Sequence, residues 1–358
     1  MSAEQTLARA AERGVHCLPV PTPFAVGRVN CYLIDDDPLT LLDTGPNSAT
    51  SLTALEAALA AHGHRVEELE RIVVTHQHID HIGLVEILAT RSGAEVCALD
   101  RLAPWLADYK REMEENDSFS AAIMLRNGIP QDVVHALRAV SASFRAWGAA
   151  ANVTRPLAEG ELLEFASRSW RVLHRPGHSP SDTAFWDEAS GELFGGDHLI
   201  KHISSNPLLS KPLGPRPSAE VRQERQEGES KPLRRATGEQ DDPAQRPRAL
   251  MSYLDSLRLT REMELSVVFP GHGEPIGGHR ELIEERLQMH ERRANRLCAL
   301  ITERPRNAYE LAQAMWGNVA VTQAFLTLSE VLGHVDVLID ESRVVERDED
   351  GVLRFEAA

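Results

Sequence analysis

The sequence predicts a mixed α/β protein with a small additional domain at its C-terminal end. Three observations indicate this class. Short runs of β-branched and apolar residues alternate with longer segments whose apolar residues recur at helical spacing. One short run, Arg71 to Val74, leads directly into a loop rich in histidine. The C-terminal tail has helical patterns and then two alternating segments on either side of Asp350-Gly351, which indicates a β-hairpin.

Composition limits the class of protein further. The chain has 358 residues, of which 42% are hydrophobic, enough for one large domain and a small one. It has 38 Lys and Arg against 54 Asp and Glu, and this net charge of −16 argues against a general nucleic-acid or anionic-membrane surface. The four cysteines lack CxxC spacing, and neither a signal-peptide pattern nor a long apolar stretch is present. We therefore expect a cytoplasmic protein that does not enter the membrane.

The N-terminal part is expected to begin with three short strands separated by turns rich in Pro and Asp. Ser48 can cap the helix that follows, its leucines share one face, and Gly63 can end it. The expected strands are 15–20, 29–34, 39–42, 71–74 and 95–99, and the expected helices are 48–63 and 82–90.

The loop after the strand at 71–74 carries the most informative motif. From His76 to His81 it reads H-x-H-x-D-H. His76 and His78 lie on a turn where alternate residues can reach one metal ion, while Asp80 and His81 are offset and can reach another. Imidazole and carboxylate are ligands of divalent transition metals, and so many of them have no shared use in packing. The number of donors therefore argues against the simpler interpretation, a polar loop with chance histidines.

This motif resembles the signature of the metallo-β-lactamase fold superfamily of metallohydrolases. The resemblance implies further motifs in a fixed order, each at the end of a strand, and the sequence has them. They are Asp43 in L-D-T-G, His178 in P-G-H-S, Asp197 in G-G-D-H and His272 in P-G-H-G. Leu84 replaces the second glycine that often follows the aspartate-histidine pair, and we expect it to alter helix packing while leaving the ligands intact.

The resemblance implies a four-layer αββα sandwich and a binuclear metal centre. One ion would be held by His76, His78 and His178 and the other by Asp80, His81 and His272, with Asp197 bridging them. Asp43 and His198 would support these ligands from behind. We expect two zinc ions per chain, with iron or manganese as alternatives because no thiolate is present. A hydroxide bridging the metals would attack the substrate, and catalytic Asp80 would orient it and transfer its proton.

Residues 101–150 form an insertion that is almost entirely helical in pattern. Trp105, Tyr109, Met113, Met124 and Phe144 are among its large apolar residues. One interpretation is a set of helices that covers an edge of a sheet. The other is a helical insertion over the metal site that shapes a pocket for an acyl or other hydrophobic group. The two interpretations are compatible.

The residues after Asp197 supply the candidates for substrate binding. Lys201 and His202 follow this aspartate closely, where they could bind a charged group of the substrate. Residues 204–248 are rich in Pro, Gly, Arg and Glu and have the composition of a flexible loop. The loop begins with N-P-L-L at Asn206, which resembles the family's loop at the rim of the active site.

The second half returns to strands and then ends in a tail. Strands are expected at 161–165, 170–174, 183–186, 192–194 and 266–269, and helices at 248–263, 281–303 and 321–337, with a further helix started by a capping box at Asn307. The helices and hairpin of the tail resemble the C-terminal winged-helix domain of one branch of the family. The expected domains are therefore a hydrolase domain, 1–280, and a winged-helix domain, 281–358.

The resemblance implies a hydrolase, and the residues leave its substrate open. An acyl-thioester or related ester, free or linked to a carrier, is the first hypothesis, and an endoribonuclease or phosphodiesterase is the second. A DNA-binding winged-helix regulator is the alternative of another class. From Glu291 to Ala358 there are 8 Arg against 12 Asp and Glu, and this net charge of −4 argues against DNA binding. We therefore expect a small-molecule substrate, no nucleic acid, and a tail used for packing or homodimerisation.

Overall fold

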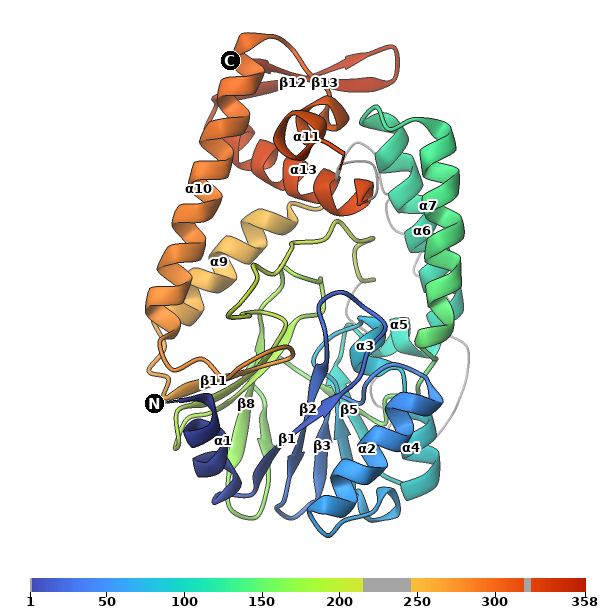
Figure 1. Cartoon of the computed structure of the whole chain (residues 1–358), viewed down its shortest axis with the longest axis vertical. Coiled ribbons are helices and arrows are strands. Elements are labelled where there is room, and N and C mark those ends of the chain that lie inside the picture. The colour runs from blue at the N-terminus through green and yellow to red at the C-terminus, as the bar shows by residue number, and fades with distance from the viewer. Residues whose placement is uncertain (1, 215–245, 319–322) are drawn as a thin grey trace.

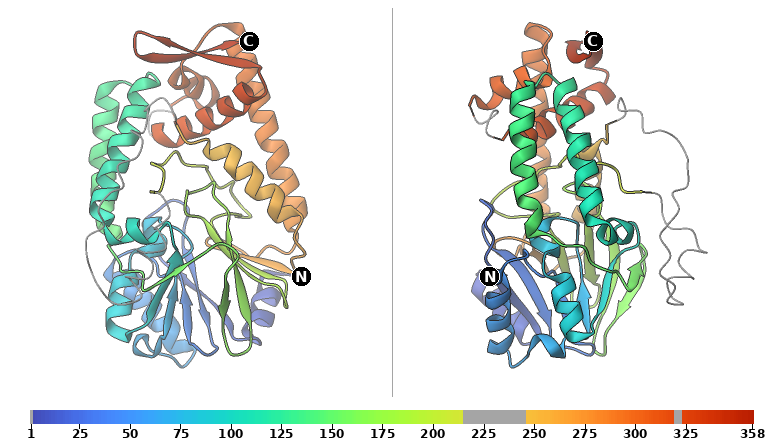
Figure 2. Two further views of the ribbon diagram at one scale, coloured as in Figure 1. Left: turned by 180° about the vertical axis from the view of Figure 1, so that it is seen from behind. Right: turned by 90° about the vertical axis from the view of Figure 1, so that its right-hand side faces the viewer.

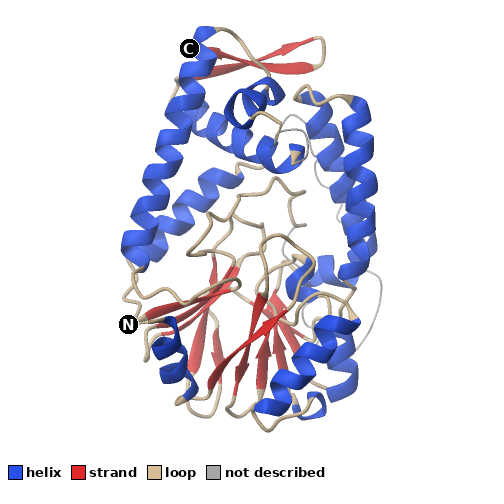
Figure 3. Cartoon of the chain, in the orientation of Figure 1, coloured by secondary structure: helices blue, strands red, loops and turns tan. Residues whose placement is uncertain are grey.

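Two β-sheets face each other in the computed structural model, which describes residues 2–214, 246–318 and 323–358 (Figures 1 and 3). The first sheet has the order β1 (Val15–Val20), β2 (Val29–Ile34), β3 (Thr40–Leu42), β4 (Arg71–Val73), β5 (Glu95–Leu99), β6 (Arg155–Leu157). The second has the order β11 (Val267–Pro270), β10 (Glu192–Gly196), β9 (Thr183–Asp187), β8 (Ser169–His174), β7 (Leu162–Glu164). The predicted strands are present, and among the described residues the one strand that was not predicted is β6, a short strand that contains a proline.

Strand direction brings the functional loops to one edge. The strands β3, β4, β5 and β6 run parallel to one another, and β10 runs parallel to β11. Because the carboxyl ends of parallel strands meet at the same edge of a sheet, the loops after β3 and β4 emerge together. The loops after β10 and β11 emerge together from the other sheet in the same way.

Aromatic side chains fill the space between the sheets. Phe194 and Phe269 of the second sheet pack against Tyr32 of the first, and Trp170 packs against Phe194 and Phe185. All five side chains are buried in one cluster. Helices cover the outer faces: α2 (Ala49–Ala61), the short η1 (Val66–Glu68) and α4 (Val85–Ser92) cover the first sheet, and α9 (Ala249–Arg261) and α10 (His279–Glu303) the second. The N-terminal helix α1 (Ala3–Ala11) packs against β1, and its Ala10 joins the cluster between the sheets. The predicted αββα sandwich is thus confirmed (Figure 2).

The expected helix at 82–90 is divided into two. The short α3 (Ile79–Ile82) carries two of the predicted ligands, and α4 begins three residues later. The chain passes very close to its neighbours between them, because a Cβ at Gly83 would lie 2.1 Å from the backbone nitrogen of Asn47 and 2.4 Å from the carbonyl oxygen of Trp147. Leu84, which replaces the family's second glycine, directly precedes α4 and is fully buried in the hydrophobic core.

The insertion has two different parts. It contains α5 (Ala103–Ala107), α6 (Tyr109–Arg126), α7 (Gln131–Phe144) and η2 (Arg145–Trp147). Trp105 and Tyr109 are buried in the core of the first sheet, so this end covers the sheet. Beyond it, α6 and α7 form a helical hairpin that stands beside the C-terminal elements, with Met124 buried between them (Figure 1). Trp105 and Tyr109 are therefore unavailable to a substrate, as the interpretation of helices that cover a sheet edge implies.

The C-terminal elements contain the predicted helices and hairpin. The structure has α11 (Ala308–Trp316), α13 (Ala324–Asp340), β12 (Val344–Glu349) and β13 (Val352–Ala357). Asn307 caps α11 through the predicted capping box with Glu310. The expected boundary at residue 280 falls in the first turn of α10, a continuous helix, and the division into domains remains a prediction. Residues 319–322, around the start of the helix expected at 321–337, lie outside the described residues.

The two ends of the expected flexible loop are described, and residues 215–245 lie outside the described residues. The first end differs from the prediction, since Leu209 is buried among the apolar residues of α6 and α13. At the other end, Arg246 forms ion pairs with Asp336 and Glu346 of the C-terminal elements. No described helix combines the length and the apolar character that crossing a membrane requires.

Candidate metal centre

Loops at the ends of four strands bring the predicted metal ligands together. The segment after β4 carries His76, His78, Asp80 and His81, the last two on α3. The loops after β8, β10 and β11 carry the other three, His178, Asp197 and His272. Two hydrogen bonds join the segment after β4 to the segment after His178. The Gln77 amide donates to the Ser181 hydroxyl, and the Thr183 amide donates to the Thr75 carbonyl.

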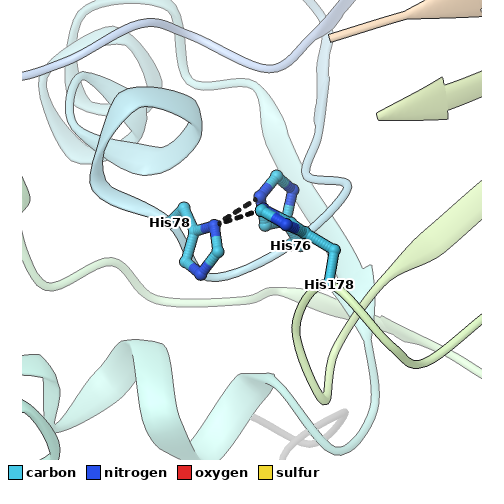
Figure 4. Close-up of side chains that lie close together, drawn as sticks. All are labelled: His76, His78 and His178. Carbon is cyan, nitrogen blue, oxygen red and sulfur yellow. Dashed lines mark hydrogen bonds between the residues drawn. The ribbon is translucent and has the colours of Figure 1, made fainter. Parts of the chain in front are cut away.

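The first group of donors is His76, His78 and His178 (Figure 4). Nδ1 of His78 lies 3.0 Å from Nε2 of His76 and 2.8 Å from Nε2 of His178. One ring nitrogen can donate only one proton, so it cannot form a full hydrogen bond to both. Nitrogen ligands of a tetrahedral zinc ion lie about 3.3 Å apart, given zinc–nitrogen distances of about 2.0–2.1 Å. A slight separation of the three rings would therefore admit an ion.

The second group is Asp80, His81 and His272. Nε2 of His272 lies 3.3 Å from Oδ2 of Asp80. Asp197 lies between the groups: its Oδ2 is 3.5 Å from Nε2 of His178 and 3.6 Å from Nε2 of His272, and its Oδ1 is 3.6 Å from Nε2 of His81. One carboxylate oxygen thus faces donors of both groups, the arrangement that a bridging ligand requires.

Unsatisfied buried atoms test whether this site fits metal ions. Nε2 of His81, Nε2 of His272 and Oδ1 of Asp197 are buried and have no hydrogen-bond partner. Buried polar atoms in proteins are nearly always bonded, and leaving one unsatisfied costs about 1–3 kcal/mol. All three atoms point into the same small volume, where cations would satisfy them. The residues therefore fit a metal centre.

The other ring nitrogen of most of these histidines is already held. Nδ1 of His81 donates to Oδ2 of Asp43 over 2.7 Å, which leaves Nε2 with its lone pair free for an ion. Nδ1 of His272 donates to the Arg28 carbonyl over 2.8 Å, and Nδ1 of His178 to the Asn206 carbonyl over 3.1 Å. Hydrogen bonds behind the rings therefore fix the orientation in which Nε2 faces the centre.

Thr75 extends the support behind His76. Its hydroxyl donates to Oδ2 of Asp43 over 2.8 Å and so can accept from Nδ1 of His76 over 3.0 Å. Asp43, with a backbone φ of 56°, also accepts from the Thr75 amide. Asp43 thus bonds to His81 directly and to His76 through the Thr75 hydroxyl.

The histidines of the two donor groups differ in their protonation. Burial, reinforced by neighbouring imidazoles, lowers the pKa of His178 to about 3 and that of His78 to about 4, so both are neutral and able to bind an ion. Burial also acts to lower the pKa of His81, but Asp43, Asp197 and Asp80 together raise it to about 10. In the chain alone, a proton on His81 thus balances carboxylates that a metal ion would otherwise neutralise.

Asp80 remains ionised in this environment. Burial alone would raise its pKa, but the imidazoles of His81 and His272 hold that pKa well below its ordinary value.

The backbone before His272 passes very close to two of the predicted ligands. A Cβ at Gly271 would lie 2.3 Å from Oδ1 of Asp197 and 2.8 Å from Cε1 of His81, so the residue before His272 must be glycine.

The other predicted site residues have partners of their own. His198 is buried and its Nε2 bonds to the Thr260 hydroxyl, so its ring packs against α9. Lys201 is exposed and forms an ion pair with Glu274. The exposed ring of His202 lies against Gly273, next to His272. The side-chain amide of Asn206 donates to the Leu326 carbonyl of α13, away from the centre.

Sequence reasoning missed several groups that hold the ligands. Thr75 was overlooked, although its position directly before His76 could have identified it. The carbonyl groups of Arg28 and Asn206 could not have been found, because every residue has a carbonyl and only the fold selects two of them. Asn30 and Tyr32 of β2 bond to the Pro270 carbonyl and so position the loop that carries His272.

Known proteins with the same features were found by sequence and by structure. The sequence profile described as Metallo-beta-lactamase superfamily matches residues 25–272. A probable metallo-hydrolase of Bacillus subtilis, YqjP, is 32% identical over 341 residues, 95% of this chain and 97% of the relative. A hydroxyacylglutathione hydrolase of Haemophilus influenzae, GloC, is 24% identical over 186 residues, 50% of this chain and 70% of the relative.

A solved structure agrees over almost the whole length. The crystal structure of a metallo-beta-lactamase family protein from Thermus thermophilus superposes with a TM-score of 0.73 at 26% identity, covering 96% of this chain and 99% of that one. The agreement therefore includes the helical insertion and the C-terminal elements as well as the two sheets.

Proposed function

This chain belongs to the metallo-beta-lactamase superfamily and is a metal-dependent hydrolase, and we propose that its centre holds two zinc ions and hydrolyses an acyl-thioester or a related ester. The observation that supports the binuclear centre is the convergence of seven donors in two groups on either side of Asp197. Iron and manganese remain alternatives to zinc, because all the donors are nitrogen and oxygen.

The proposed ligands are those of the two groups. His76, His78 and His178 would hold one ion, Asp80, His81 and His272 the other, and Asp197 both. When bound, such ions lower the pKa of a water molecule and polarise the carbonyl group under attack. The chain contributes the orientation of each ring and an ionised carboxylate, Asp80, that can accept a proton from the attacking water.

The surroundings of the centre favour an apolar acyl group. The last turns of the insertion contact both the loop after β3 and α3, since the Trp147 carbonyl accepts from the Asn47 amide and Gly148 packs against Ile79 of α3. Phe144, at the end of α7, is 37% exposed and its ring centroid lies 5.7 Å from that of Phe24. Exposed aromatic surface beside a hydrolytic centre suits a hydrophobic substrate group.

Charge and similarity support the same substrate class. A nuclease gathers polyanions, whereas this chain carries a net charge of −16. Hydroxyacylglutathione, from which one relative takes its name, is a thioester. A ribonuclease of the same fold is the competing hypothesis, and the charge of the chain argues against it.

A substrate panel on the metal-loaded protein tests the proposal. We expect hydrolysis of acyl-thioesters to exceed that of phosphodiesters and single-stranded RNA, and the Asp80→Ala variant to lose it. Cleavage of RNA that is lost in Asp80→Ala, with no thioesterase activity, would overturn the substrate class and leave the metal centre standing.

A further inference from the structure

A second pocket lies behind the loop that carries His178. Its volume is about 260 Å³, and it lies where the end of β8, the loop 176–180, the segment 208–213 and the start of α9 meet. His178 itself turns towards the metal centre, but its neighbours Gly177 and Ser179 line this pocket. The two sites therefore share one loop while facing opposite sides of it.

The described lining of the pocket has no acidic side chain, although the chain is strongly acidic overall. The described residues that line it include Arg101, His174 and Arg248, and none of them is Asp or Glu. Ser210 and Ser252 add hydroxyl groups, while Ser179 already donates to the buried Asp182. Because the chain has 54 Asp and Glu, an acid-free pocket with two arginines is a selective environment for an anion.

Arg101 is the most informative of these residues. It is partly buried, its Nε is fully buried without a hydrogen-bond partner, and within the described parts of the chain it forms no ion pair. Withdrawing a guanidinium from water without a carboxylate nearby is unfavourable unless another anion replaces the lost solvation. Guanidinium groups bind phosphate and carboxylate through two parallel hydrogen bonds.

The start of α9 strengthens the positive potential. The helix has 13 residues, no acidic residue in its first turn and no side-chain cap at Arg248. Its N-terminal end therefore contributes a partial positive charge beside Arg101. Arg248 is exposed, and in the described part of the chain its ion pair is with the exposed Asp340 at 3.2 Å, a surface pair of little strength that a ligand can replace.

We propose that this pocket binds the phosphate or carboxylate group of a small organic anion, with the Arg101 guanidinium as the principal contact. The anionic group belongs either to a distant part of the substrate or to a separate effector molecule. Either source would act on the metal centre through Gly177 and Ser179. Movement of this loop is restricted on the other side, because a Cβ at Gly177 would lie 2.5 Å from Cβ of Tyr253 in α9. The proposal does not depend on the substrate class proposed above.

Binding of inorganic phosphate to the full-length, metal-loaded protein tests the site. Ser252→Asp places a carboxylate in the pocket and should weaken this phosphate site at least tenfold, while an acid in the first turns of a helix does not destabilise the fold. Ser252→Asn is the matched neutral control and should bind as wild type. Arg101→Gln should weaken the site by a similar factor, and Arg258→Gln, at an exposed arginine further along α9, should not. Any phosphate held at the metal centre is common to all five proteins and cancels in the comparison.

Tungstate, a phosphate analogue that is located by anomalous scattering, identifies the site in crystals. We expect a tungstate peak within hydrogen-bonding distance of the Arg101 guanidinium that is absent in Ser252→Asp. A phosphate isotherm that is the same in wild type, Ser252→Asp and Arg101→Gln, or tungstate at the metal centre alone, would overturn the proposal.

The source of the anion is then decided by kinetics. With an anionic thioester, a Ser252→Asp variant with a raised KM and little change in kcat would assign the pocket to the substrate. An unchanged KM, with a rate that responds to added phosphate in wild type and not in Ser252→Asp, would assign it to an effector. The binding experiments need no turnover, so they remain decisive if the proposed hydrolysis is not found.

Discussion

Two groups of histidines in this chain contain similar residues in different surroundings. The metal centre lies on loops, whereas His290 of α10 and Glu330 and His334 of α13 lie between helices and are also close enough to hold an ion. In the helical group, His334 Nδ1 donates to the Glu330 carbonyl over 2.6 Å, so its Nε2 can accept from Nδ1 of His290 over 3.1 Å. The two imidazoles thus bond to each other, and Nε2 of His290 is left buried without a partner.

The balance of charge separates the two groups further. Glu330 in the helical group is paired with Arg293 at 3.1 Å, so no carboxylate is left to attract a cation. In the loop group, the ion-pair partners of Asp80 and Asp197 among the described residues are all histidines, and Nε2 of His81 and of His272 have no hydrogen-bond partner. Residue types alone therefore do not define a metal site. Unbalanced carboxylates and free lone pairs do, and only the loop group has both.

The largest expected effect is on turnover at the loop group. Asp80→Ala and the isosteric Asp80→Asn should each lower kcat by a factor on the order of 10³ or more, because a ligand and a proton acceptor are lost together. The circular dichroism spectrum should be unchanged, since Asp80 lies on the short α3 and belongs to none of the hydrophobic clusters. His334→Ala, in the helical group, should retain turnover. Wild-type kcat with full metal loading in Asp80→Asn would show that its assigned role is wrong.

Deletion of residues 307–358 removes one side of the helical group and tests how much the rest of the chain depends on it. Met124 of the insertion and Leu297 and Ile301 of α10 are buried in the same cluster as residues of the deleted part. Their exposure should drive association, visible as a higher mass in light scattering. An unchanged mass with unchanged activity would instead show that the tail is an independent module.

A smaller effect is expected behind the metal ligands. Asp43→Asn preserves the shape of the residue and tolerates its positive φ, but it removes the carboxylate that accepts from His81. We expect metal affinity to fall by about 10–100-fold in a competition titration with a chelator. Asp36→Asn, at a carboxylate paired with Arg168 on a turn, is the matched control and should bind metal as wild type. Equal metal affinities in Asp43→Asn and Asp36→Asn would show that Asp43 does not support the metal ligands.

The smallest effect concerns the helical group and pH. Burial, together with His334 and nearby arginines, lowers the pKa of His290 to about 3. Its unfolded value is about 6.5, so between these values the unfolded chain binds more protons and stability falls as the pH is lowered. His290→Gln can still donate to His334 but cannot be protonated.

This variant should therefore reduce the slope of unfolding free energy against pH, measured between about pH 5 and 6, by up to about 1.4 kcal/mol per pH unit. His135→Gln, at an exposed histidine of α7, is the control for loss of a histidine elsewhere. Identical slopes in wild type and His290→Gln would show that the buried histidine pair does not contribute.

Local patterns account for what the sequence could predict. The strand at 71–74, the capping box at Asn307 and the loop motif from His76 to His81 depend on neighbours in the chain, and the structure has all three. The contact of Leu209 with α13 and the pairing of His290 with His334 join residues far apart in sequence. Nothing local marks them, because helix patterns show which face is buried and not what covers it.

The metal content of the protein tests the central claim most directly. Elemental analysis of protein purified without chelator should give two transition-metal ions per chain, unchanged in His290→Gln and strongly reduced when His76 and His78 are both replaced by alanine. That result would place both ions at the loop group. A clean value below one ion per chain, or two ions of which one is lost in His290→Gln, would contradict a binuclear centre built from these seven ligands.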